Sequence, residues 1–465
     1  MSDVIDAFLA QPKLLVVPAA VLIGVLLIVV LVRAYRASRS GGPRTVESRS
    51  LPPLKTTPGA KIDSIPGFQR RLNHRVSRQD GSPAEMLDDL FAMGFSLAAS
   101  DIHFTPSSTG TRVAMRVHGV LYEMVTLPAD FYLAIVSRVR VLSDITFYER
   151  NKPQDGEIRL AGGYTARVSM LPTNRGEKCV FRLAGTEGQD YDIDKLGMDA
   201  EMLGEWKALL TAAQGLLVLT GPTGSGKTTT MYAALTRIAA TRGDSANIVT
   251  LEDPVEFDFD TFSQTQIDPV NDLTFATGLR SLLRQDPDVI LVGEIRDDET
   301  TEIALRASMT GHLILTTLHA DSASGVFNRL LQMNAQPFHV ASALRAVISQ
   351  RLCKRLCPDC LEPTSVTDEN RRVLRQLRID SLDGPFFRSR GCENCLDKGF
   401  IGRVPIFELL IVTERVRDLI NESQPTHVID RAAREDGMLT LFDDGLRRAR
   451  RGEVLLDELL SIVIR

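Results

Sequence analysis

The segment 221–228 reads GPTGSGKT and fits the pattern G-x-x-x-x-G-K-[ST] of a phosphate-binding loop at every position. An apolar run at 216–219 precedes it and a helical pattern follows it, as such a loop requires. Glycines let backbone N–H groups close around phosphates, Lys227 reaches the β and γ phosphates, and the Thr228 hydroxyl is placed for Mg²⁺. The sequence therefore predicts an ATP site formed by Gly221, Pro222, Thr223, Gly224, Ser225, Gly226, Lys227 and Thr228.

Carboxylates follow two of the predicted strands. Glu294 comes directly after the apolar run VILVG, at the edge where α/β sheets bind ligands, and we predict that it is the general base that activates water. The alternative is a surface glutamate paired with Arg296. Upstream, Glu252, Asp253 and Glu256 could hold the water shell of the metal or orient the attacking water. Acidic turns before proline are also common without any such role.

Two histidines flank the predicted strand LILTTL, so that one lies at each of its ends. A lone histidine is usually structural, and the residues alone favour that interpretation for both His312 and His319. His319 follows the carboxyl end of the strand and is the better candidate for sensing the γ phosphate.

Four of the six cysteines form two C-x-x-C pairs, separated by the 31 residues of 361–391. Two such pairs suit a tetrahedral Zn²⁺ site that would stabilise a loop-rich extension. We expect the other two cysteines, Cys179 and Cys353, to be small buried residues. The predicted zinc ligands are Cys357, Cys360, Cys392 and Cys395.

The elements that position these residues read as alternating strands and helices, which predicts an α/β fold with a parallel sheet covered on both faces. A smaller α/β domain at 83–190 precedes this ATPase core at 191–350, and Ser82 is expected to cap its first helix. A helix at 339–350 leads into the tetracysteine extension at 351–405, and the pattern from 406 to 465 predicts helices.

The N-terminal part has a different character. Residues 14–32 carry no charge and are long enough to cross a bilayer as a helix, with basic residues following them. This predicts one membrane anchor with residues 1–13 outside and the rest of the chain on the cytoplasmic side. The stretch 33–82 is rich in Ser, Pro, Gly and Arg and is expected to be a flexible basic linker.

The composition limits the choice of partner. The formal net charge of -5 argues against a protein whose main task is to bind nucleic acid, because such proteins usually carry a basic excess. Six cysteines in 465 residues are too few for a disulfide framework and indicate a reducing compartment.

Together these motifs resemble the secretion ATPases of the GspE/PilB type, which power type II secretion and type IV pilus assembly. The likeness covers roughly 84–465. It rests on the motifs above together with SDIHFTP at 100–106, PQDG at 153–156, RVSMLPTNRGEKCVFRL at 167–183, RQDPDVILVGEIRDDET at 284–300 and TGHLILTTLHAD at 310–321.

The resemblance implies a RecA-like core, a homohexameric ring, ATP bound between the two domains, and an inner-membrane platform protein as partner. It also implies that His312 and His319 belong to the nucleotide site. In addition, Arg167 or Arg182 of the smaller domain would approach the phosphates when the domains close.

Two features depart from the family pattern. Thr105 stands where an acidic residue is usual, and the membrane segment stands where an N-terminal docking domain is common. Related retraction ATPases typically lack the paired cysteines, which favours assembly or secretion. A membrane-tethered DNA translocase and a nucleotide-binding scaffold without hydrolysis are the alternatives. The acidic net charge counts against the first, and intact Lys227, Thr228 and Glu294 count against the second.

Overall fold

The computed structural model describes residues 65–463, with gaps at 79–81, 144, 147–150, 161–163, 185–190, 377–378 and 380–381. The predicted membrane segment at 14–32 lies outside the described residues. Among the residues that are described, no helix combines the length and apolar character needed to cross a membrane.

The small domain, residues 65–184, is a six-stranded sheet in the order β3-β2-β1-β6-β5-β4, in which all the strand pairs are antiparallel. Phe91 and Tyr132, from two helices, pack against Phe104 and Phe181 of the sheet. Ser82 forms the predicted cap, because its side chain accepts a hydrogen bond from the Glu85 N–H. The elements are α3 Ile65–Arg78, α4 Pro83–Ser96, β1 Ala99–Ser107, β2 Gly110–Val117, β3 Val120–Leu127, α5 Ala129–Leu142, β4 Gln154–Arg159, β5 Thr165–Thr173 and β6 Gly176–Ala184.

Helix α3 corrects the prediction that 33–82 is a flexible linker throughout. Ile65, Phe68 and Leu72 recur at helical spacing and are all buried. The Gln69 side chain also donates to the Glu123 carbonyl of β3 at 2.6 Å. Average composition concealed this stripe, because three apolar residues on one face are enough to attach a helix that is polar elsewhere.

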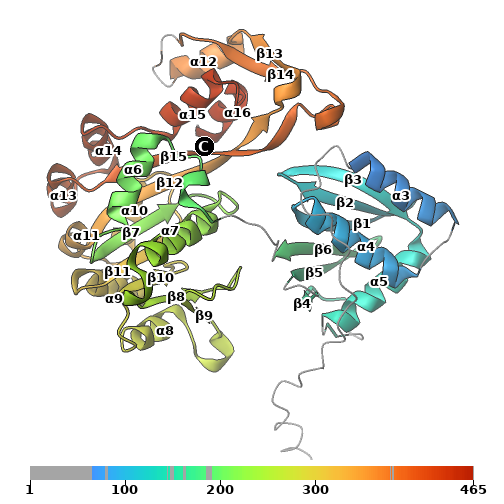
Figure 1. Ribbon diagram of the computed structural model, residues 1–465, viewed down its shortest axis with the longest axis horizontal. Helices are drawn as coiled ribbons and strands as arrows, with labels where there is room; N and C mark the ends of the chain where they lie inside the picture. The colour runs from blue at the N-terminus through green and yellow to red at the C-terminus, as the bar shows by residue number, and fades with distance from the viewer. Residues whose placement is uncertain are drawn as a thin grey trace, which may run out of the picture. The chain divides into compact units, whose positions relative to one another are not determined.

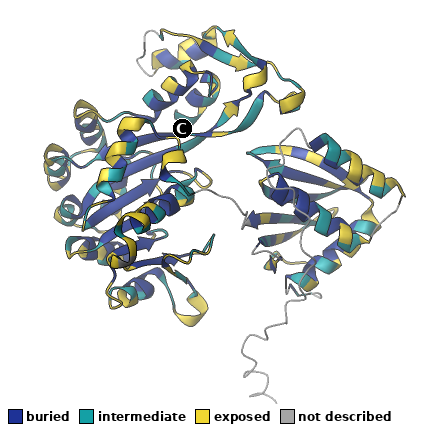
Figure 2. Ribbon diagram, viewed as in Figure 1, coloured by how far each residue is buried: buried dark blue, intermediate teal, exposed yellow. Residues whose placement is uncertain are grey.

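The core domain, residues 191–463, is built on a seven-stranded sheet in the order β15-β12-β7-β11-β10-β8-β9, in which only β15 is antiparallel to its neighbour. Its central strands are buried along their length, as expected for a parallel sheet covered on both faces (Figure 2). The strands are β7 Gly215–Thr220, β8 Ile248–Glu252, β9 Ser263–Gln266, β10 Val289–Val292, β11 Leu313–Leu318, β12 Leu344–Leu356 and β15 Phe400–Ile411.

Helices cover the two faces of this sheet (Figure 1). Trp206 of α6 and Met231 of α7 belong to one apolar core, whereas Phe327 of α10 and Val416 of α13 belong to the core on the other face. The predicted α/β fold is therefore confirmed. The helices are α6 Ala200–Leu209, α7 Lys227–Arg242, α8 Phe275–Leu282, α9 Asp298–Met309, α10 Gly325–Gln332, α11 Pro337–Ala343, α13 Glu414–Asn421 and α14 Thr426–Glu435.

Strands β12 and β15 correct two further predictions. The helix expected at 339–350 ends at Ala343, and residues 344–356 form β12, which pairs with β7. The region from 406 onward begins inside β15 and not in a helix. Fully buried strands and buried helices both read as apolar runs, so periodicity could not separate them here.

Beyond β7, strands β12 and β15 continue together into the extension, up to the pair Leu356 and Phe400. Helices α12, α15 and α16 contribute to an apolar core that includes Cys353 and Ile406 of these strands. The extension therefore has its own core and is fixed to the main sheet through two shared strands. Its elements are β13 Leu361–Thr364, α12 Asp368–Gln376, β14 Phe386–Ser389, α15 Leu441–Arg450 and α16 Leu456–Val463.

Candidate functional site

The phosphate loop connects the central strand β7 to α7, as the sequence predicted. Gly221, Gly224 and Gly226 have φ values of 149°, 77° and 89°, a region that glycine enters without strain. The Lys227 ammonium donates to the carbonyls of Gly221 at 2.8 Å and Pro222 at 3.0 Å. These contacts hold the lysine across the loop at the start of α7, where backbone N–H groups favour anions.

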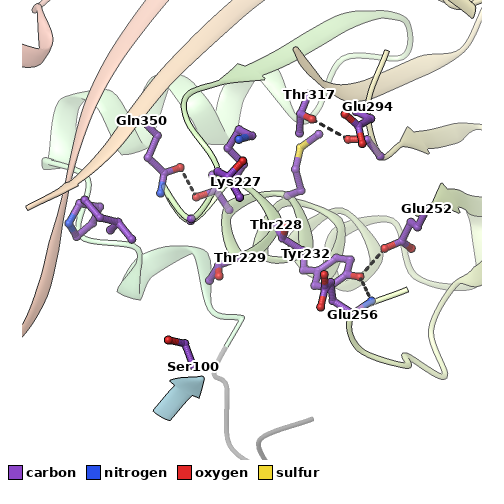
Figure 3. Close-up of a pocket in the computed structure, with 18 of the residues that line it drawn as sticks. Ser100, Lys227, Thr228, Thr229, Tyr232, Glu252, Glu256, Glu294, Thr317 and Gln350 are labelled. Atoms are coloured by element: carbon purple, nitrogen blue, oxygen red, sulfur yellow. Dashed lines mark hydrogen bonds between the residues drawn. The ribbon is translucent and has the colours of Figure 1, made fainter. Parts of the chain in front are cut away.

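Lys227 faces Glu294 across the pocket. Burial lowers the pKa of the Lys227 ammonium, Glu294 raises it, and the Arg351 guanidinium lowers it, with a net downward shift. Both side chains line one pocket together with Thr228, at the carboxyl end of the sheet (Figure 3). The structure thus brings the predicted lysine and the predicted base to the same site.

Glu294 lies just beyond β10 and is 18% exposed. Arg296 donates to one of its oxygens, and His319 Nε2 lies 3.7 Å from the other. Arg296 also lies 3.7 Å from Asp253, so it links the two carboxylates. The ion pair of the alternative interpretation is therefore present, and its Glu294 carboxylate lines the pocket.

Glu252 also lines the pocket, but its oxygens are held by hydrogen bonds within the protein. It is 4% exposed and accepts hydrogen bonds from Tyr232 of α7, Thr250 of β8 and Gln264 of β9. Burial and the Glu252 carboxylate raise the pKa of Tyr232, so its hydroxyl stays a donor. Because its oxygens are used within the protein, Glu252 connects α7 to β8.

Asp253 and Glu256 line the pocket with Glu294 and the Thr228 hydroxyl. A hydroxyl and carboxylates are the hard oxygen ligands that suit Mg²⁺ and its water shell. The residues present therefore fit the predicted metal.

The two histidines lie at opposite ends of β11. His319 lines the pocket, whereas His312 Nδ1 lies 3.0 Å from the Ala307 carbonyl and the His312 carbonyl accepts from Gly215 at the start of β7. The structure brings His319 to Glu294 but does not bring His312 to the site, because β11 separates them by its full length.

Arg167 and Arg182 face each other across β5 and β6 of the small domain. Arg182 Nε lies 3.3 Å from Asp101, and its side chain is 65% exposed. Their predicted role at the phosphates stays a prediction.

The two cysteine pairs meet because β12 and β15 are antiparallel neighbours and β13 and β14 also pair. Cys357 follows β12 directly, and its N–H donates to the Gly399 carbonyl just before β15. Their sulfurs all lie within 4.8 Å of one another, with contacts of 3.8 Å for Cys357–Cys392, 3.9 Å for Cys360–Cys395 and 3.7 Å for Cys392–Cys395.

These separations suit a metal. Four sulfurs placed tetrahedrally at about 2.3 Å from Zn²⁺ lie about 3.8 Å apart. The Cys395 sulfur also accepts from the N–H groups of Cys392 and Gly399, both at 3.2 Å, which favours a thiolate. Cys353 and Cys179 are buried elsewhere, as expected.

The contribution of β12 to the pocket was not predicted from the sequence pattern. Gln350 and Leu352 line it, and Gln350 accepts from Thr230 of α7 at 2.8 Å (Figure 3). A polar residue inside an apolar run was the available signal, but the assignment of this run to a helix concealed which residue met the loop.

Comparisons with known proteins agree on one group. The profile of the family described as "Type II/IV secretion system protein" matches residues 77–461. The type II secretion system ATPase E of Vibrio cholerae is 39% identical over 389 residues, 83% of this chain and 76% of that protein. The type IV pilus assembly ATPase PilB of Myxococcus xanthus is 40% identical over 410 residues, 87% of this chain and 72% of that protein.

Solved structures extend the likeness to the fold. The pilus retraction motor PilT with bound ADP is 26% identical, with a TM-score of 0.55, over 80% of this chain and 96% of that chain. The ATPase DotB of Legionella pneumophila shares the fold, with 20% identity and a TM-score of 0.62. The match covers 83% of this chain and 96% of that chain.

Proposed function

The chain belongs to the family of type II/IV secretion system proteins, and on that premise we propose that it hydrolyses ATP to drive pilus assembly or type II secretion. Membership of the family confirms the resemblance inferred from the sequence motifs. The two relatives compared above are named as ATPases of secretion and of pilus assembly.

One observation carries the proposal for ATP hydrolysis. A phosphate loop and an acidic side chain lie in one pocket, which Lys227 and Glu294 both line. Lys227 supplies the positive charge for the phosphates, and the Thr228 hydroxyl would hold Mg²⁺. Glu294 accepts the proton of the attacking water, and Arg296 and His319 hold its carboxylate in place.

The test is ATP binding and phosphate release by the full-length chain. The wild type should bind ATP and hydrolyse it only with Mg²⁺, whereas Lys227→Ala should lose binding because the charge facing the phosphates is gone. A wild-type protein that neither binds ATP nor releases phosphate would refute the proposal.

The biological process rests on family membership and on the paired cysteines. We assign the protein to a homohexameric ring that acts on an inner-membrane platform protein, with closure around each nucleotide as the working stroke. Arg167 or Arg182 of the small domain then completes the phosphate site in the closed state. A strain that carries Glu294→Gln should lose its pili or stop exporting its substrates, and normal assembly and export would support the DNA-translocase alternative.

We also retain residues 14–32 as a single membrane anchor, with the ring on the cytoplasmic face. The uncharged run and the basic residues after it support this orientation. Protease added to intact spheroplasts should leave the core domain uncut, and cleavage near the phosphate loop would contradict the topology.

The four cysteines hold one structural Zn²⁺. The sulfur separations and the N–H donors to Cys395 support this assignment. The ion would join the ends of β12 and β15 and take no part in hydrolysis.

A further inference from the structure

We propose that Gln350 is a positioning residue of the nucleotide site, which holds the phosphate loop and the first turn of α7 in the shape that binds phosphate. The inference rests on the proposed function, because it assigns a role within the same site. It comes from three contacts that this one residue makes, two with the ends of the loop and one with the first turn of α7.

The first contact places Gln350 where the loop begins. The last pair between β12 and β7 is Ser349 with Thr220, so Gln350 is the next residue of β12 as the neighbouring chain turns away at Gly221. A Cβ atom added to Gly221 would lie 2.4 Å from the Gln350 carbonyl oxygen. The backbone of Gln350 therefore sets how closely the loop can start beside the sheet.

The second contact is at the other end of the loop. A Cβ atom added to Gly226 would lie 2.7 Å from Gln350 Nε2. Gly226 directly precedes Lys227 and has a φ of 89°. The first and last glycines of the loop thus both pack against Gln350, one against its backbone and one against its side chain.

The third contact fixes the side chain. Gln350 Oε1 accepts from the Thr230 hydroxyl at 2.8 Å, and the Thr230 N–H donates to the Gly226 carbonyl at 3.1 Å. Thr230 is fully buried and Gln350 is 3% exposed, so this hydrogen bond is shielded from water. The amide group therefore brackets the turn from Gly226 to Thr230.

This turn carries the residues that bind phosphate. Lys227 and Thr228 lie between Gly226 and Thr230, and Lys227 lines the pocket beside Gln350 (Figure 3). A turn that is free to shift would present the ammonium and the N–H groups in many positions, and binding would then have to order them. Gln350 supplies that order before the nucleotide arrives.

The experiment measures the Kd of Mg-ADP for the full-length chain, and the melting temperature without nucleotide. Gln350→Leu and Thr230→Val should each weaken Mg-ADP binding by about tenfold, because each removes the same buried hydrogen bond. The double variant should bind no more weakly than the weaker single variant, since both changes break one contact. In ATP hydrolysis, the loss should appear mainly in KM.

Matched variants separate positioning from folding. Thr230→Ser keeps the hydroxyl and should bind Mg-ADP within about twofold of the wild type. If Gln350→Leu does not fold, the comparison of Thr230→Val with Thr230→Ser still tests the hydrogen bond. Gln376→Leu makes the same change on the exposed surface of α12 and should leave the Kd unchanged.

The outcomes are distinguishable. A lower melting temperature with an unchanged Kd, or losses that add in the double variant, would overturn the role of Gln350 while leaving the nucleotide site intact. A wild-type chain that does not bind Mg-ADP would overturn the proposed function itself.

Discussion

Replacing Glu294 by glutamine should abolish turnover while leaving both folding and nucleotide binding nearly unchanged. Glutamine keeps the size of the side chain and an oxygen that can accept from Arg296. What it loses is a carboxylate that can take up a proton. A positioned general base contributes about 10²- to 10⁴-fold, so the activation barrier should rise by about 3–5 kcal/mol.

The effect on stability should be much smaller. The main charged partner of Glu294 is Arg296, whose side chain is 60% exposed. An ion pair with so exposed a partner is worth at most about 1 kcal/mol. The effect on turnover can therefore be told apart from an effect on folding, because the expected rise in the activation barrier is larger than the expected loss of stability.

The assay is phosphate release at saturating Mg-ATP, together with the Kd of Mg-ADP and the melting temperature. Glu299→Gln is the matched control, because Glu299 on α9 also pairs with an arginine, Arg280, and both are about half exposed. Glu299 does not line the pocket, so its variant should retain full turnover. If Glu294→Gln keeps more than about a tenth of wild-type turnover, Glu294 is not the base.

Three further outcomes test other parts of the molecule. Zinc analysis should find one Zn²⁺ per chain in the wild type, less zinc in Cys395→Ser, and an unchanged amount in the control Cys353→Ala. A pure, folded wild-type protein without zinc would exclude the metal site. Leu72→Ala should destabilise the small domain by about 2–5 kcal/mol in urea denaturation, because Leu72 is fully buried. Asn73 is exposed, so an equal loss of stability in Asn73→Ala would contradict the packing of α3. Burial lowers the pKa of His103 below its usual 6.5, so the folded state binds fewer protons than the unfolded chain and the stability of the small domain should fall as the pH drops below 6.5. His103→Phe should flatten this pH dependence, measured by hydrogen exchange of the β1 amides. An unchanged slope would rule out His103 as its source.

The phosphate loop and its surroundings could be predicted because their chemistry is local. The glycines, Lys227 and Thr228 act through a backbone shape that eight consecutive residues define. The strand before the loop and the helix after it were equally clear, because their apolar patterns are long and differ in period. The position of Glu294 beside the loop followed from the same reasoning, since the end of a buried strand is a defined place in an α/β sheet.

The tetracysteine cluster was predictable for a related reason. Each C-x-x-C pair is local, and four thiols in two pairs suit one tetrahedral ion. How the pairs meet was not predictable, because it depends on β12 and β15 lying side by side over a gap of 43 residues, from 357 to 399. Helix α3 was not predicted, because only three of its 14 residues are buried.

The sequence by itself determined which residue types stand at the proposed nucleotide site, since Lys227, Thr228 and Glu294 were each identified from the residues directly beside them in the chain. The sequence also favoured His319 over His312, because His319 follows the carboxyl end of the strand, and tertiary structure placed His319 Nε2 3.7 Å from Glu294. Tertiary structure alone decided the place of Gln350, which is 124 positions after Gly226 yet packs against it. Pairing between strands distant in sequence depends on burying their apolar surfaces together, and no local pattern of residues records that partnership.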